Sequence, residues 1–382
     1  MAQKKLQRNE KKLYFCGVKI NELNMNNSFF GISLNAIGES RRDYQPSPPK
    51  QRAFLLSTIH AMNKLQVVTS NQYDPFLNRA VEQYLTDSQE ENIITMYLWK
   101  NQQTVVIGYN QNPYSECNVN LLLDEGGHLM RRGTGGGAVY HDLGNINFSF
   151  IADKSLYDVR KQLSVVQAAL LAYGLRTEIS GRNDLTCDGR KFSGNAFAKG
   201  QKNNLHHGTI LIKTDGAMMQ RYLIVDKAKL MKNGVKSVAS RIVNLSELVP
   251  ELTSENIKKP LINSFEKIYD GQAEMLDFDT FIYNRNVQAI REHIASDDFL
   301  FGRWKQFKTS KKARFLWGGV EIALQVDEAN AIITDVQIAS DCLEPETIQQ
   351  AEQLLHRAST KSAPEHDSNN EILRDIIDLI YG

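Results

Sequence analysis

The sequence predicts an α/β (α+β) protein in which a large domain of alternating strands and helices precedes a small α+β domain. Short runs of β-branched and aromatic residues alternate with amphipathic segments from residue 66 onward. The hydrophobic fraction of 42% is ordinary for a protein with a packed core. At 382 residues the chain is also long enough for two domains of roughly 100 to 200 residues each.

Residues 1–65 are predicted to be a basic N-terminal extension without folded structure. They hold 11 Lys/Arg against 4 Asp/Glu, and three of the nine prolines fall in residues 41–50, RRDYQPSPPK. Because the rest of the chain is net acidic, a binder of nucleic acid is not expected. The extension is either a solvated tail or an organelle transit peptide, and Glu10 and Glu22 count against the second possibility.

Composition also limits the compartment and the kinds of site. No apolar run approaches the roughly 20 residues that a membrane helix needs, so no membrane span is expected. The four cysteines lie far apart without CxxC spacing, which predicts neither a transition-metal site nor a disulfide framework. This usage fits a reducing compartment. We expect a monomeric cytoplasmic protein, or a mitochondrial one if the extension is a transit peptide.

The first domain is predicted to span residues 66–292 and to begin with a strand, LQVVTS. A helix follows over residues 74–88, with Asp74 as its cap and Pro75 at its first position. ITMYLWK and QTVVIG are predicted to form a strand pair. Residues 157–173 have apolar side chains at helical spacing, and Gly174 follows where a C-terminal cap belongs.

A hairpin and a second domain follow. Asp188-Gly189 predicts the turn of the hairpin, and alternation would place Ser193 and Asn195 on the face of Lys191. HHGTILIK is a further predicted strand. Because adjacent strand residues face opposite ways, at most one of its two histidines can line a site. His206 is expected to be structural. Strands over ARFLWGGVEIALQV and AIITDVQIA, then a helical ending, predict a second domain over residues 293–382.

The most distinctive segment is RRGTGGGAVYHDLGN, residues 131–145. Glycine has no side chain to hold an anion away from backbone N–H groups, so such a turn can bind phosphate. Neither the Walker pattern nor the dinucleotide pattern fits, because a strand rather than a helix follows. From glycine alone a flexible connection is equally plausible. Arg131 and Arg132 favour recognition of phosphate or carboxylate.

This segment resembles the signature of lipoate-protein ligases, which usually runs RRxSGGGAVYHDxGNxNFSF. GRNDLTCDGRKFSGNAF resembles the second block of that family, with its lysine at Lys191. The resemblance is close over about residues 70–245 and looser beyond, and residues 1–65 have no counterpart. It implies a mixed β-sheet catalytic domain of the biotin/lipoate ligase type with a small α+β accessory domain.

The resemblance also implies an activity. Such ligases use ATP and Mg²⁺ to convert free lipoate into lipoyl-AMP with release of pyrophosphate. They then transfer the lipoyl group to a lysine of a carrier domain. The expected acceptors are lipoyl domains of 2-oxoacid dehydrogenase complexes or the glycine cleavage H protein.

The same resemblance assigns roles to individual residues. Lys191 would contact both the carboxyl end of lipoate and the α-phosphate, where a fixed ammonium stabilises developing negative charge. Asn183 and Asp184 are candidate partners for phosphate and magnesium, and a turn role for Asp184 stays open. His141 could orient the acyl group or only cap a strand. The nucleotide is assigned to Arg132, Gly137, Ala138, Val139, Tyr140 and Lys191, and lipoate to Lys191, His141, Gly135 and Gly136.

Residues 214–241 are predicted to close over the adenylate as a lid that excludes water. The chain departs from the usual pattern at Thr134, where serine is common, at Ala239, where VRSR becomes VASR, and at Lys305, where proline is more usual. The change at Ala239 removes a cation from the predicted lid.

Two other functions remain possible. A lipoyl or octanoyl transferase would need a cysteine nucleophile, and Cys187, the one cysteine near the predicted site, is expected to be a small core residue. Biotin ligases usually carry a GRGR-type loop instead. A non-catalytic relative that binds lipoate or carriers is the second alternative, and the intact Lys191 and glycine turn argue against it.

Overall fold

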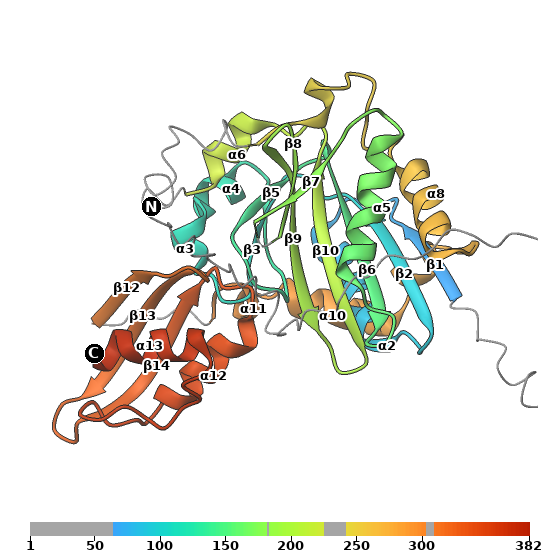
Figure 1. Ribbon diagram of the computed structural model, residues 1–382. Coiled ribbons are helices and arrows are strands. Elements are labelled where there is room, and N and C mark those ends of the chain that lie inside the picture. Colours follow the sequence, from blue (N-terminus) through green and yellow to red (C-terminus); the bar gives the residue numbers. More distant parts are fainter. Residues whose placement is uncertain (1–63, 182, 225–241, 303–308) are drawn as a thin grey trace, which may run out of the picture. The chain divides into compact units, whose positions relative to one another are not determined.

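The computed structural model describes residues 64–181, 183–224, 242–302 and 309–382, and its largest element is a mixed sheet of eight strands (Figure 1). The strands β11, β1 and β2 run parallel, and the other neighbours pair antiparallel. The predicted α/β class is thereby confirmed. The order across the sheet is β11 (Ala273–Leu276), β1 (Lys64–Thr69), β2 (Ile93–Trp99), β6 (Asn145–Asp153), β10 (Asn203–Leu211), β9 (Arg190–Lys199), β8 (Asp184–Cys187) and β7 (Glu178–Ser180).

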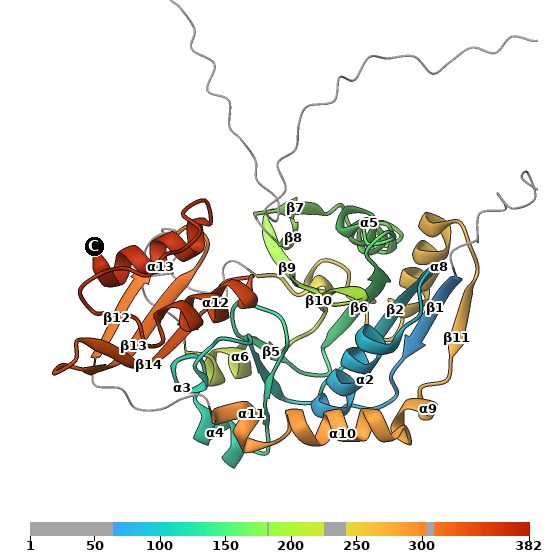
Figure 2. The same cartoon turned by 90° about the horizontal axis from the view of Figure 1, so that it is seen from below.

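Helices cover both faces of this sheet (Figure 2). The helices α5 (Val159–Leu171) and α8 (Lys258–Tyr269) pack together on one face, and α2 (Pro75–Ser88) and α10 (Arg285–Ile294) pack together on the other. All nine residues of β6 are therefore buried. The predicted cap of α2 is confirmed, because Asp74 Oδ1 accepts hydrogen bonds from two backbone N–H groups of the first turn.

The predicted pairing of the second and third strands is wrong. β2 pairs with β1 on one edge and with β6 on the other, so no edge is left for its successor. Six consecutive residues of β2 are buried, and such a strand needs a central place in the sheet. The chain instead crosses to a smaller sheet with the order β4 (His128–Arg131), β3 (Thr104–Ile107) and β5 (Val139–His141).

The hairpin β8–β9 turns where the sequence predicts. Asp188 and Gly189 have φ of 50° and 71°, the left-handed values that this kind of turn requires. The predicted alternation along β9 fails, because Thr186 pairs with Lys191 while Leu185 pairs with Ser193. Phe192 is therefore an extra residue, and this bulge exchanges the faces of the strand.

Short helices join these elements, and the last part of the chain forms an α+β unit with its own core. The short elements are α3 (Pro113–Glu116), α4 (Val119–Asp124), α6 (Gly216–Tyr222), the 3₁₀ turn η2 (Leu245–Glu247), α9 (Asp279–Ile282) and α11 (Asp297–Phe301). The C-terminal unit has an antiparallel sheet, β12 (Thr309–Arg314), β13 (Gly319–Asp327) and β14 (Ile332–Ser340), against α12 (Pro345–Leu355) and α13 (Glu371–Tyr381). The predicted α+β domain is thus present, and the boundary near residue 293 stays a prediction. None of the described helices is long and apolar enough to cross a membrane.

Burial of His206 predicts a pH dependence of stability. The side chain is fully buried against Phe148, Phe150 and Phe197. Burial, helped by the charge of His207, lowers its pKa to about 3. Because the unfolded chain binds this proton below about 6.5 and the folded chain does not, the free energy of unfolding should fall as the pH drops from 6.5 toward 3.

Denaturant unfolding at pH 7, 6 and 5 checks this expectation. His206→Gln should show a shallower fall than the wild type, whatever its stability at pH 7. The exposed His356→Gln should keep the wild-type slope. Equal slopes for the wild type and His206→Gln would contradict the assignment.

Candidate active site

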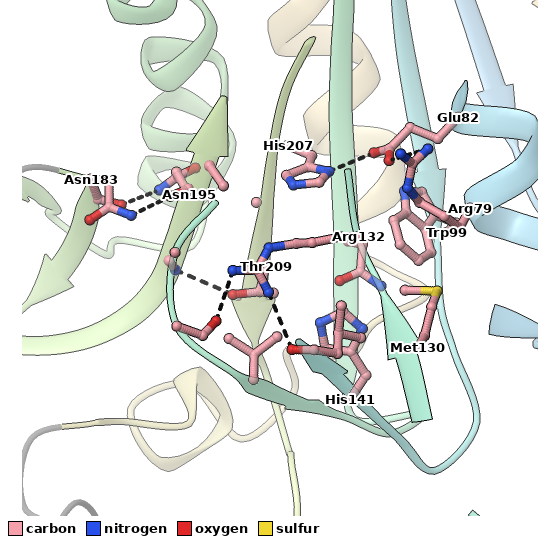
Figure 3. A pocket seen from close by; sticks show the side chains of 18 of the residues that line it. Arg79, Glu82, Trp99, Met130, Arg132, His141, Asn183, Asn195, His207 and Thr209 are labelled. Atoms are coloured by element: carbon pink, nitrogen blue, oxygen red, sulfur yellow. Dashed lines mark hydrogen bonds and ion pairs between the residues drawn. The ribbon is translucent and has the colours of Figure 1, made fainter. Parts of the chain in front are cut away.

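A pocket lies where the glycine turn meets three other parts of the fold (Figure 3). Arg79 and Glu82 reach it from α2, and Trp99 reaches it from the end of β2. Lys191 and Asn195 line it from β9. The side chains from α2 and β2 lie at one end, whereas Asn183 and Asn195 lie at the other end (Figure 3).

The glycine turn is held in a fixed shape by Arg132. Arg132 is 7% exposed, and its Nη2 donates to the carbonyl oxygens of Gly135 at 2.7 Å and Gly137 at 2.8 Å. Burial lowers the pKa of Arg132 to about 10, so it remains charged at neutral pH. Gly136 has a φ of 91°, a value that side chains rarely allow. The turn is therefore an ordered wall of the pocket and not a flexible connection.

Arg131 does not enter the pocket, contrary to the expectation that both arginines face the anion. Its side chain is 1% exposed and donates to the carbonyl oxygens of Gly108, Tyr109 and Gln111. Adjacent residues of a strand point to opposite faces, so only one member of the pair can face the turn. Arg131 instead ties β4 to the loop after β3.

Lys191 lies at the pocket with Asp184 as its partner. Its Nζ is 2.8 Å from Asp184 Oδ1, and both side chains are about a third exposed, at 38% and 34%. A Cβ on Gly194 would stand 3.0 Å from this Nζ, so the glycine leaves room for the lysine. Asn195 also lines the pocket, and Ser193 is absent from its lining.

His141 is neutral and offers an unused donor. Its Nδ1 accepts from Asn101 Nδ2 at 3.3 Å, so its proton is on Nε2, which is buried without a hydrogen-bond partner. Burial, with the charges of Arg132 and His207, lowers its pKa to about 3. At neutral pH this side chain can donate a hydrogen bond to a ligand but cannot supply a proton as an imidazolium.

A chain of hydrogen bonds runs from the glycine turn to the far end of the pocket. Arg132 Nε donates to Thr134 Oγ1 at 3.1 Å, and that hydroxyl lies 2.9 Å from His207 Nε2. His207 Nδ1 donates to Glu82 Oε1 at 2.8 Å. Thr134, at one of the departures from the family pattern, thus carries the hydroxyl that links the two sides.

Glu82 is the last member of this series of hydrogen bonds, and its carboxylate is fully buried. Ser149 Oγ donates to its Oε1 at 2.5 Å, and Arg79 Nη1 lies 3.6 Å from its Oε2. Burial alone would raise the pKa of Glu82. The charge and hydrogen bond of His207, with Arg79 and Ser149, instead lower it to about 2.

Comparison with known proteins assigns the chain to a family. Residues 74–266 match the family model of the lipoyl protein ligase A/B catalytic domain, and residues 305–363 match that of the bacterial lipoate protein ligase C-terminus. A lipoate-protein ligase A of Bdellovibrio bacteriovorus is 37% identical over 294 residues, which cover 75% of this chain and 86% of that protein. The chain belongs to the lipoate-protein ligase family.

Solved structures of similar proteins agree with this assignment. LipL1 of P. falciparum in complex with lipoate has a TM-score of 0.72 at 28% identity, and the match covers 83% of this chain and 99% of that one. A bi-partite lipoate protein ligase from Thermoplasma acidophilum, solved in a study with its E2 lipoyl domain, has a TM-score of 0.54 at 21% identity and covers 64% of this chain and 99% of that one. This second likeness shows the shared fold.

Some residues of the glycine segment line the pocket and others face away from it. Gly136, Gly137, Val139 and His141 line the pocket. Tyr140 points the other way and packs against Tyr222, with Ala138 beside the same apolar cluster. Alternation along β5 accounts for this division. Gly135 lies against the C-terminal unit, where a Cβ would stand 2.0 Å from the carbonyl oxygen of Cys342.

The other expected residues fall into three groups. Asn183 lines the pocket and bonds to Asn195, whereas Asp184 is absent from the pocket lining and forms an ion pair with Lys191, which lines it. Cys187 is buried in the main core and is absent from the pocket lining, as expected for a small apolar residue. His206 is structural, as expected. Most of the predicted lid, with Ala239, and also Lys305 lie outside the described residues.

Sequence reasoning missed the end of the pocket formed by Arg79, Glu82, Trp99 and His207. For His207 the signal was present, because strand alternation and the structural role expected for His206 leave His207 as the histidine that can face a site, although no role was assigned to it. Arg79 and Glu82 lie on a largely buried helix, and nothing in their spacing along the sequence distinguishes them from its other residues.

Removal of the Glu82 carboxylate should destabilise the protein strongly. Glu82→Ala would leave Arg79 buried without its counter-charge and His207 without its acceptor, a change that costs about 3–5 kcal/mol. Denaturant unfolding measures the loss. Glu274→Ala, which removes an ion pair between half-exposed partners, should leave the free energy of unfolding close to that of the wild type. Similar losses for the two variants would contradict the role of Glu82.

Proposed function

We propose that this chain is an ATP-dependent lipoate-protein ligase that forms lipoyl-AMP from free lipoate and transfers the lipoyl group to a carrier lysine. One observation carries the proposal. Lys191, a partly exposed ammonium, shares a single pocket with an ordered glycine turn. The name of the Bdellovibrio bacteriovorus relative and the lipoate complex of LipL1 support the same activity.

The charges suit the first half-reaction. The lipoate carboxylate attacks the α-phosphate, a P–O bond to pyrophosphate breaks, and negative charge spreads over the transferring group. Lys191 Nζ would stabilise that charge from a fixed position, and the charged Arg132 holds the backbone of the turn toward the same space. The ion pair with Asp184 restrains the position of the Lys191 ammonium group although the side chain is partly exposed.

The nucleotide would lie along the glycine turn. Gly136 and Gly137 expose backbone there, and Val139 presents a small apolar side chain to the pocket. Arg132 donates most of its N–H groups to the turn itself, so we assign it to shaping the site more than to gripping phosphate. Tyr140 and Ala138 would act only through their backbone, since their side chains face the apolar cluster behind the turn.

Magnesium fits this site only together with substrate phosphates. Among the residues that the structure describes, no group of three or more His, Cys, Asp or Glu side chains could hold a metal ion. Mg²⁺ commonly binds one or two carboxylates and several phosphate oxygens. Asp184 is the nearby carboxylate that would contribute, with the Asn183 amide beside it, and the ion would neutralise phosphate charge.

The second half-reaction needs a carrier. A lipoyl domain of a 2-oxoacid dehydrogenase complex, or the glycine cleavage H protein, would supply the lysine whose amine attacks the acyl carbon and releases AMP. A cysteine-dependent transferase is disfavoured for the described cysteines, because Cys117, Cys187 and Cys342 are all buried and absent from the pocket lining. Burial also raises the pKa of the Cys187 thiol, which opposes its reactivity.

Lipoate-dependent ATP–pyrophosphate exchange tests the assignment of Lys191. The wild type should catalyse exchange, and Lys191→Ala should lose at least about 100-fold in rate, the usual effect of removing a group that stabilises transition-state charge. Lys199→Ala, an exposed lysine at the other end of the same strand, should retain wild-type exchange.

Two results would contradict the proposal. Exchange that survives in Lys191→Ala would remove the role of this lysine. Absence of exchange in the wild type would favour the transferase or the non-catalytic binding protein. Chelation of divalent cations in the same assay should stop exchange, and added Mg²⁺ should restore it.

A further inference from the structure

Arg79 is a buried guanidinium with unused hydrogen-bond donors. The residue is 4% exposed, and its Nη2 donates to Gln83 Oε1 at 2.7 Å. Nε and Nη1 are buried without a hydrogen-bond partner, since Glu82 Oε2 lies 3.6 Å from Nη1. Buried donors are nearly always satisfied in folded proteins, and an exception calls for an explanation such as a ligand.

The position of Arg79 identifies which part of a ligand it would meet. It lines the pocket together with Glu82 and Trp99, at the end away from Asn183 and Asn195 (Figure 3). Lys191 lies on the same strand as Asn195. If the carboxyl group of an acid lies at Lys191, its chain runs toward Arg79. The far end of the acyl chain would therefore meet the unpaired N–H groups.

We propose that Arg79 is a specificity-determining residue that selects acids whose far end carries a neutral hydrogen-bond acceptor. This inference rests on the proposed function and names the acyl group that its site prefers. A neutral acceptor is favoured because Glu82, ionised and 3.6 Å away, already balances the charge of the guanidinium. The sulfur of a dithiolane and a terminal hydroxyl belong to this class, and a plain hydrocarbon end does not.

The physical basis is the cost of an unsatisfied donor. A hydrocarbon end would leave the buried Nε and Nη1 without an acceptor, whereas an acceptor at the end of the acyl chain would pair one of them. A site with buried polar groups rejects a ligand that fails to pair them more strongly than an apolar site rejects an added hydroxyl. His141 Nε2–H, another unused donor that lines the same pocket, acts in the same direction.

Two acids of nearly equal size test the proposal in the full-length protein. In 8-hydroxyoctanoate a terminal hydroxyl replaces the last methyl group of nonanoate, so an apolar pocket would prefer nonanoate. With Arg79 present, kcat/KM for ATP–pyrophosphate exchange should favour 8-hydroxyoctanoate by on the order of tenfold. In Arg79→Leu this preference should be lost or reversed. Arg160→Leu, an exposed arginine on α5, should keep the wild-type ratio.

A folding defect would not obscure the result. The double variant Arg79→Leu/Glu82→Gln removes both charges of the buried pair, and the wild-type ratio is informative without any variant. A wild type that prefers nonanoate, or a ratio unchanged by the loss of Arg79, would overturn the inference. Each series includes lipoate as a control. Exchange with lipoate but no preference between the two acids would contradict only the role of Arg79. No exchange with lipoate would contradict the proposed function and this inference with it.

Discussion

The pocket depends on one buried carboxylate, that of Glu82. Ser149 and His207 donate to one of its oxygens, and Arg79 lies near the other. These groups come from α2, β6 and β10, so a single side chain holds a helix against two central strands of the sheet. A carboxylate without exposure must be paired, and the pairing sets where each partner can lie. Through His207 and Thr134 the same constraint reaches the glycine turn.

The two ends of the pocket differ in the chemistry they can support. The end near Lys191 is partly exposed and carries an ammonium group, paired with Asp184, that can contact an anionic group. The end near Arg79 and Glu82 is closed and polar but balanced in charge, which suits recognition of a neutral group. His141 lies in the same pocket as a buried neutral donor, and we propose that it orients a ligand and does not transfer a proton.

Much of the fold and about half of the site could be predicted from the sequence. Capping at Asp74 and the Asp188-Gly189 turn depend on local chemistry, and both were predictable. The pairing of β2 was not, because a strand buried on both faces does not show which neighbours it has. The bulge at Phe192 likewise depends on pairing with β8. Arg79 escaped notice because a charged residue on a helix usually lies in solvent, and only the tertiary fold buries it.

A crystal structure with a non-hydrolysable lipoyl-adenylate analogue would test the central claim most directly. The account predicts that the linkage between acyl group and phosphate lies beside Lys191 Nζ, with adenosine along the glycine turn. The dithiolane should then lie within hydrogen-bond or van der Waals contact of Arg79 Nε or Nη1. An acyl chain that runs away from Arg79, or a linkage out of reach of Lys191, would contradict it.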